Sequence, residues 1–173
     1  MKQRNFAKTA LIMLLACMVG AYAAAQTNDE PLPSGFYFGI PASLYTTYSA
    51  IGLQAGYQFK KTINVRMEFN TACSSLHDER SVYAIPAVSL LFSKIGRGPV
   101  RFYNGVTFGI ERGLKNSFGE NICFMNLTAG VELYAVSKTS FFIEIQGAGF
   151  ATPVIEGSYQ GGTVIKGGAH YYF

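Results

Sequence analysis

Residues 62–72 alternate strictly between apolar and polar side chains. One set is Ile63, Val65, Met67 and Phe69, and the intervening set is Asn64, Arg66, Glu68 and Asn70. Successive side chains point to opposite faces in a β-strand, so this period of two predicts a strand with one apolar and one polar face. The chain that follows the N-terminal apolar run shows no heptads and no helical apolar stripe, so its fold has to be built from strands.

Seven further segments show the same period with varying strength. They are 36–45, 48–59, 82–93, 100–111, 122–136, 141–151 and 162–173. The alternation in 82–93 is weak, and two prolines, Pro41 and Pro86, fall inside predicted strands. Because proline lacks a backbone N–H and a closed sheet offers no free edge, we expect each proline to mark a bulge or a misplaced strand end.

After the first connection, the connections between these segments alternate between short and long. The short ones are 60–61, 94–99 and 137–140, and the long ones are 73–81, 112–121 and 152–161. The first connection, at 46–47, is expected on the side of the long loops but is unusually tight. Short turns on one side and longer loops on the other are typical of membrane barrels. Eight strands also return the C-terminus to the side on which the first strand begins.

The first 25 residues have the features of a secretory signal peptide. A basic start with Lys2, Arg4 and Lys8 precedes an apolar run and the small residues 21–25. This pattern predicts cleavage after Ala25, and the apolar run is too short for a retained membrane helix. An alternative is lipoprotein cleavage before Cys17, which would leave that cysteine acylated.

Removal of this segment changes what the charge implies. Three of the 14 Lys and Arg residues lie in this segment, so the mature chain has 11 basic residues against 10 Asp and Glu. The mature chain is therefore near neutral, and no nucleic-acid partner is expected. About 148 residues remain, enough for one domain. Charged residues make up 14% of the chain, well below the ~25% of ordinary soluble domains, and Gly and aromatic residues are frequent. This composition fits a protein that crosses a membrane with strands.

The last predicted strand ends on an aromatic residue. One face carries Ile165, Gly167, Ala169, Tyr171 and Phe173, and the other carries Lys166 and His170. A soluble domain rarely ends in this way, because chain termini tend to be polar and frayed. The ending resembles the closing strand of small bacterial outer-membrane β-barrels of the outer membrane protein A and X type.

This resemblance implies an all-β fold, an eight-stranded antiparallel up-and-down transmembrane β-barrel at 36–173. A cleaved signal peptide (1–25) and a short periplasmic leader (26–35) would precede it. Tyr171 and Phe173 would be an assembly signal read by the barrel assembly machinery. The resemblance further implies the outer membrane of a Gram-negative bacterium, with outer-membrane lipid around the barrel and outer loops that can meet an extracellular ligand.

If the apolar face meets lipid, the polar face fills the barrel. The interior would then hold Arg66, Glu68, Arg101, Glu111, Glu132, Glu144, Lys166 and His170. Buried charges are costly unless they are paired, and the interior of an eight-stranded barrel is just filled by side chains. We therefore expect a polar network that plugs the barrel, and a structural or surface-interaction role without catalysis or cofactor.

Two alternatives stay open at this point. One is a narrow pore for small solutes or ions, since the same polar face could line a pathway. The other exchanges the faces and gives a soluble exported β-barrel that binds an apolar ligand inside.

Other chemistry is weakly indicated. Residues 74–79 contain Ser, His and Asp, but a catalytic triad is defined by geometry rather than by proximity in sequence. The two histidines and the cysteines Cys73 and Cys123 are too far apart in the chain to suggest a metal site. Whether Cys73 and Cys123 form a disulfide is left open.

Overall fold

A computed structural model describes residues 34–45, 48–59, 62–74, 81–95, 99–115, 122–152 and 163–173. They form β1 (Gly35–Leu44), β2 (Ser49–Phe59), β3 (Ile63–Ser74), β4 (Ser81–Ile95), β5 (Val100–Lys115), β6 (Ile122–Val136), β7 (Thr139–Thr152) and β8 (Val164–Tyr172). The predicted signal peptide, nearly all of the predicted leader and the Ser–His–Asp loop lie outside the described residues. Within the described ranges, no helix is long and apolar enough to cross a membrane.

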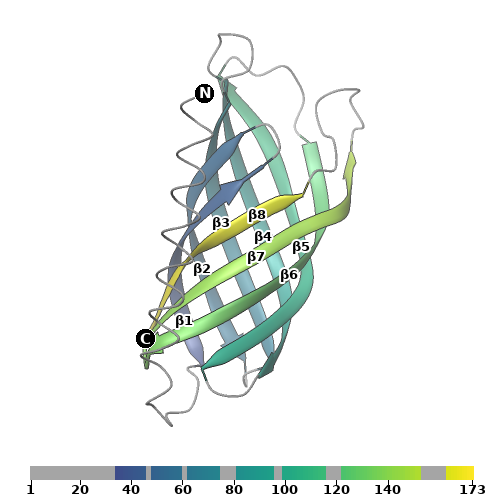
Figure 1. Ribbon diagram of the computed structural model, residues 1–173. Coiled ribbons are helices and arrows are strands. Elements are labelled where there is room, and N and C mark those ends of the chain that lie inside the picture. Colours follow the sequence, from purple (N-terminus) through teal and green to yellow (C-terminus); the bar gives the residue numbers. More distant parts are fainter. Residues whose placement is uncertain are drawn as a thin grey trace.

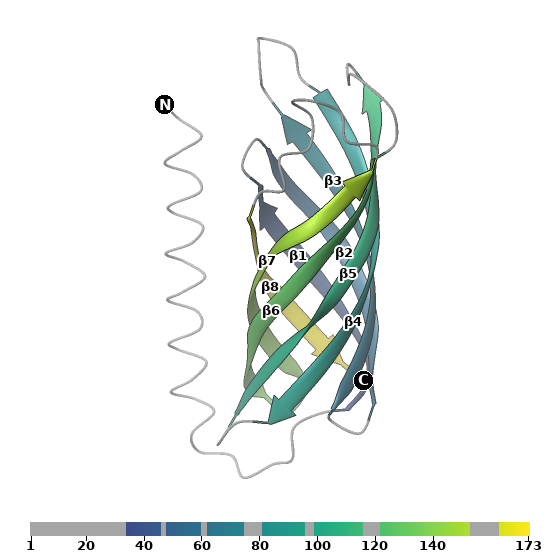
Figure 2. The same cartoon turned by 90° about the vertical axis from the view of Figure 1, so that its right-hand side faces the viewer.

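The eight strands close into one barrel in which each strand pairs antiparallel with its neighbours in the chain (Figure 1). β1 and β8 close the ring, from the pair Tyr37–Tyr172 to the pair Leu44–Ile165. Figure 2 shows that the strands run obliquely to the barrel axis, as closure of a twisted sheet requires. The predicted eight-stranded up-and-down barrel is therefore confirmed.

The two ends of the barrel differ in what they carry. We call the end where β1 begins and β8 finishes the terminal rim, and the other end the opposite rim. At the terminal rim the last residue is tied into the sheet, since the Phe173 N–H donates to the Phe36 carbonyl at 3.1 Å. The chain turns between β1 and β2, β3 and β4, β5 and β6, and β7 and β8 at the opposite rim.

The barrel wall has an apolar outer face and a mostly polar inner face. The outer face exposes large apolar side chains, among them Leu53, which is 68% exposed, and Phe173, also 68% exposed. In β3, the residues Asn64, Arg66, Glu68 and Asn70 point inward and are buried. These faces are opposite to those of a soluble barrel with an apolar interior, so that alternative is wrong.

Both prolines are accommodated without a bulge or a strand end. Pro41 pairs with Gly168 of β8, while the ladder to β2 omits Pro41 and resumes at Ala42 in the same register. Pro86 pairs with Phe69 of β3, and the ladder to β5 likewise skips it without a register shift. Each proline therefore leaves a gap in the ladder on one side only. The expectation of a bulge or misplaced end is wrong, because one intact neighbouring ladder holds the strand in line.

Four strands, β3, β4, β5 and β7, are longer than the alternation predicts, and β5 and β7 show the reason. β5 continues to Lys115, since Gly113 still pairs with β4 although the sequence there is typical of a loop. β7 begins at Thr139, directly after a turn at 137–138, and this start brings the buried Ser140 into the interior. Cross-strand pairing thus overrides local composition at both places.

Aromatic rings lie over glycines on the inner face of the wall. Tyr37 is paired directly with Gly56, and Tyr103 directly with Gly130. A Cβ added at either glycine would overlap the ring of its tyrosine partner. The absence of a side chain therefore lets each ring lie flat against the wall and fill the interior.

Replacement of Gly130 by alanine is expected to lower the free energy of unfolding by about 1–3 kcal/mol, because the new methyl group displaces the Tyr103 ring. Urea unfolding of the barrel in detergent would measure the change. Gly147→Ala is the matched control, since its added Cβ would meet no atom closer than 3.9 Å. Equal unfolding midpoints for the two variants would contradict the prediction.

Candidate functional site: the polar interior of the barrel

The middle of the barrel holds a closed ring of alternating charges. Arg66 of β3 makes two hydrogen bonds to Glu144 of β7, at 2.8 and 3.0 Å, and also lies 3.0 Å from Glu68. Lys166 of β8 lies 2.7 Å from Glu68 and 3.4 Å from Glu144. Each of the four side chains thus has two partners of opposite charge, and the Arg66–Glu144 pair links strands that are four apart around the barrel. We call this group the central charge ring.

A second cluster lies nearer the terminal rim, with the Glu132 carboxylate at its centre. Its partners are Arg101 at 3.4 Å, His170 Nδ1 at 2.7 Å, Tyr134 at 2.9 Å, Tyr172 at 2.9 Å and Ser140 at 2.5 Å. The Arg101 guanidinium also lies 4.9 Å from the centre of the Tyr134 ring. Hydrogen bonds to a carboxylate are stronger than those between neutral groups, so this arrangement holds Glu132 firmly in place. We call this group the Glu132 cluster.

His170 occupies the space between the two groups. Its two ring nitrogens face Glu132 and the Gln54 amide, and its ring stacks on Phe142 with centroids 4.5 Å apart. Tyr37 packs on it as well, at 4.5 Å. The imidazole is therefore enclosed on its faces and both nitrogens are engaged, which leaves it no free position for proton transfer to a substrate.

Hydroxyl groups continue the network across the opposite wall. Ser89 of β4, Thr107 of β5 and Thr128 of β6 form a row with oxygen–oxygen distances of 2.9 and 2.8 Å. Ser89 also lies 3.4 Å from Glu68, which connects the row to the central charge ring. The interior at this level is occupied by side chains from strands around most of the barrel.

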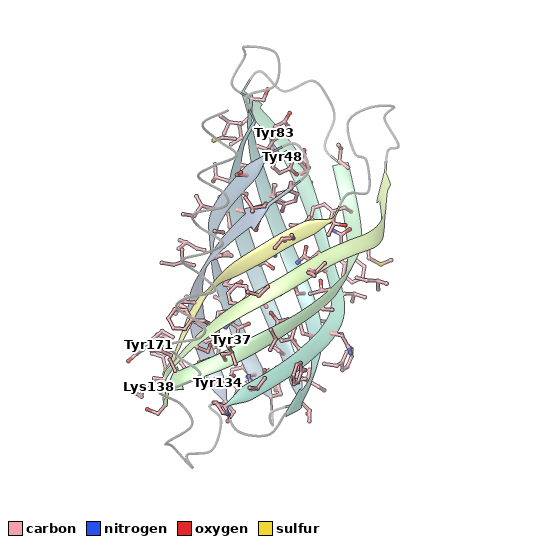
Figure 3. All side chains as sticks on the ribbon, viewed as in Figure 1. Tyr37, Tyr48, Tyr83, Tyr134, Lys138 and Tyr171 are labelled. Carbon is pink, nitrogen blue, oxygen red and sulfur yellow. The ribbon has the colours of Figure 1, made fainter. Side chains whose placement is uncertain are left out.

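Toward the opposite rim an apolar cluster occupies part of the interior. Ala50, Ala72, Ile85, Ala87 and Phe124 form a buried cluster, and the rings of Tyr45, Tyr48 and Tyr83 pack against it. Figure 3 shows Tyr48 and Tyr83 at this end, with Tyr37, Tyr134, Tyr171 and Lys138 at the other. We call this cluster the apolar plug; the buried polar residues Ser43 and Asn70 pair directly with two of its members, Ala50 and Ile85.

All eight charged or titratable residues singled out in the sequence are buried. Seven of them belong to the central charge ring or the Glu132 cluster. Glu111 is separate: it lies near the opposite rim, and the Tyr48 hydroxyl donates to it at 2.7 Å. The alternation predicted that all eight lie on the inner face, but nothing in the chain order indicated which residues of different strands meet.

Several residues of the network carried no strong signal in the sequence. Tyr37, Tyr172 and Ser140 are buried and polar, yet aromatic and small residues also occur on the outer face. The alternation along each strand could still have identified them, because each lies an even number of residues from a residue that points inward on the same strand.

The described residues contain no group of three or more His, Cys, Asp or Glu side chains that could hold a metal ion. Cys73 and Cys123 are both free and exposed. They lie on β3 and β6, with β4 and β5 between them, so the open question of a disulfide is answered by two separate thiols.

No protein-family model matches the chain, and no curated protein sequence does. Solved structures do match. Neisserial surface protein A (NspA) is 13% identical, covers 81% of this chain and 98% of its own, and gives a TM-score of 0.61. The N-terminal β-barrel domain of Pseudomonas aeruginosa OprF is 14% identical, covers 82% of this chain and 100% of its own, and also gives 0.61. The Pseudomonas aeruginosa outer membrane protein OprG is 12% identical, covers 82% and 97%, and gives 0.55.

These likenesses extend over nearly the whole length of each matched structure. At this level of identity they concern the fold. The chain therefore has the fold of the small eight-stranded outer-membrane β-barrels.

Proposed function

We propose that this chain is a non-catalytic barrel of the outer membrane of a Gram-negative bacterium, with a structural or surface-interaction role. The observation that carries the proposal is the central charge ring, in which Arg66 reaches across the lumen to Glu144. Charges are inside and paired, while Leu53 and other large apolar side chains face outward. Only an apolar solvent makes this inverted arrangement favourable.

The terminal rim would face the periplasm in this proposal. Tyr171 and Phe173 are exposed on the outer face of the closing strand, where the barrel assembly machinery could read them. The opposite rim would then present the connections at 112–121 and 152–161 to the environment and to any extracellular ligand. The name of NspA, a surface protein, supports a surface role for a barrel of this shape.

A filled interior argues against both catalysis and conduction. The histidine of the described interior, His170, has both nitrogens engaged, so it is poorly placed as a general base. The central charge ring spans the lumen, and the apolar plug, which includes Ile85 and Phe124, fills part of the interior toward the opposite rim. The pore alternative would require the central charge ring to move aside.

The test begins with fractionation and electrophoresis. We expect the protein in the outer-membrane fraction, soluble only with detergent, and migrating differently in gels before and after heating. Extraction into plain buffer would overturn the membrane assignment. Surface labelling of cysteines introduced at 112–121 should succeed on intact cells, and labelling only after lysis would reverse the proposed orientation.

Planar-bilayer recording separates the plugged barrel from the pore. The wild-type protein is expected to give no stepwise conductance, because the interior is occupied. The double variant Arg66→Ala/Glu144→Ala removes the pair that crosses the lumen but leaves Lys166 beside Glu68, so no charge is stranded. It should raise the conductance relative to Arg112→Ala, whose side chain is exposed. Regular conductance steps from the wild-type protein would contradict the plugged barrel and show that the protein is a pore.

A further inference from the structure

Glu111 is the one acid in the described part of the chain without a basic partner. The other three, Glu68, Glu132 and Glu144, each lie within 3.4 Å of at least two cationic or titratable nitrogen groups. Glu111 is only 7% exposed, and its sole described hydrogen bond comes from the Tyr48 hydroxyl to Oε2. Its second carboxylate oxygen has no described partner.

The charges of the interior leave this carboxylate unmatched. The described buried residues include four carboxylates but only three Arg or Lys side chains: Arg66, Arg101 and Lys166. All three cations already pair with carboxylates of the central charge ring or the Glu132 cluster. A carboxylate removed from water is costly unless a cation or several hydrogen bonds compensate it. Glu111 pairs with Ile122 at the start of β6, so it lies near the opposite rim, where no described ion pair joins it to any of these three cations.

A stack of three tyrosine rings lies beside this position, and its central ring, Tyr48, is the one bonded to Glu111. The Tyr45 and Tyr48 rings stack at 4.3 Å, and the Tyr48 and Tyr83 rings stack at 5.7 Å. Tyr83 pairs with Gly113, so it lies diagonally across from Glu111 on the same inner face of neighbouring strands. Tyr45, Tyr48 and Tyr83 are only half-buried. Figure 3 shows Tyr48 and Tyr83 together at this end of the barrel.

We propose that the opposite rim binds a small organic cation, such as an alkylammonium group. A carboxylate supplies the opposite charge, and tyrosine rings attract cations through their faces while they tolerate apolar substituents. Glu111 pairs with the charged nitrogen, the Tyr83 and Tyr45 rings contact its methyl groups, and Phe124 and the rest of the apolar plug form the floor. The proposal rests on the proposed function, which turns this rim toward the environment.

The binding test uses two probes of the same shape and different charge. Choline is titrated into the detergent-solubilised barrel by calorimetry, and the neutral 3,3-dimethyl-1-butanol is titrated in parallel. Binding of choline is expected to saturate, with the neutral probe at least about tenfold weaker, which corresponds to roughly 1.4 kcal/mol. Tyrosine emission gives a second readout, because the chain has no Trp.

Four variants assign the binding to this site. Glu111→Gln is expected to weaken choline at least about tenfold and to leave the neutral probe unchanged, since only the charge is lost. Tyr83→Leu should weaken choline severalfold, while Tyr48→Phe, which keeps the ring, should weaken it less. Phe102→Leu is the control, because that ring is exposed near the start of β5 at the terminal rim, and it should bind as the wild type does.

The inference would be overturned by no saturable heat from choline up to about 10 mM, about ten times a millimolar Kd, or by equal binding of both probes. Undiminished binding by Glu111→Gln would overturn it as well. Heat-dependent gel migration is measured first for every variant, so failure to fold is recognised separately. A protein that behaves as a folded membrane barrel yet ignores choline would refute this site and leave the proposed function intact.

Discussion

Replacement of Arg66 by methionine is expected to lower the free energy of unfolding by about 3–5 kcal/mol, because it leaves buried carboxylates without their main cation. Arg66 contacts both Glu144 and Glu68, and all three side chains are almost wholly buried. Lys166 alone would then face two carboxylates. Urea unfolding of the barrel in detergent, followed by circular dichroism, would measure the loss.

Two further variants test whether charge rather than volume is responsible. Arg112→Met removes an exposed arginine and should change stability by less than about 0.5 kcal/mol. Arg66→Met/Glu144→Gln should be more stable than the sum of its single changes predicts, by about 0.5–3 kcal/mol, because no stranded charge remains at Glu144. Strict additivity of the two changes would show that the central charge ring does not act as a unit.

Introduction of arginine at Leu53 is expected to destabilise the barrel in a lipid bilayer by about 2–4 kcal/mol, the cost of a charge on the lipid face near the midplane. Leu53 lies near the middle of β2 and is 68% exposed. On a water-facing surface the same change would be harmless. The measurement is the free energy of unfolding from liposomes, compared with that of the wild-type protein.

Leu114 provides the matched control for depth. It is also exposed, at 59%, but lies one residue from the end of β5 at the opposite rim. Leu114→Arg should cost no more than about 1 kcal/mol, since a charge near the interface reaches water. If Leu53→Arg were as mild as Leu114→Arg, or made the protein soluble without detergent, the outer face could not be in contact with lipid.

Much of the wall was predictable from residues 62–72 and the weaker segments like them. A period of two assigns every side chain of a strand to one of two faces, so Arg66 and Glu68 were placed together with Lys166 and His170. The strand ends were less predictable. The β5 extension to Lys115 depends on pairing with β4, and a loop-like composition conceals it.

The prolines illustrate the same limit. Pro41 and Pro86 argued against continuous strands, because the sequence shows only that an N–H is missing. In the barrel each proline keeps one complete ladder, to β8 or to β3, and interrupts the other. In a closed sheet every strand has a neighbour on each side. A proline that loses a hydrogen bond to one neighbour is therefore held in the sheet by the other.

The sequence by itself determined the class of fold and the face on which each charged residue lies, because alternation is a property of neighbouring residues. Only the tertiary structure decided which charges meet. Arg66 and Glu144 are 78 positions apart and lie on strands β3 and β7, and closure of the barrel brings them within hydrogen-bonding distance across the lumen. Closure also left Glu111 apart from the other buried charges, since contact across a barrel depends on height along the axis and on angle around it, which no period in the sequence encodes.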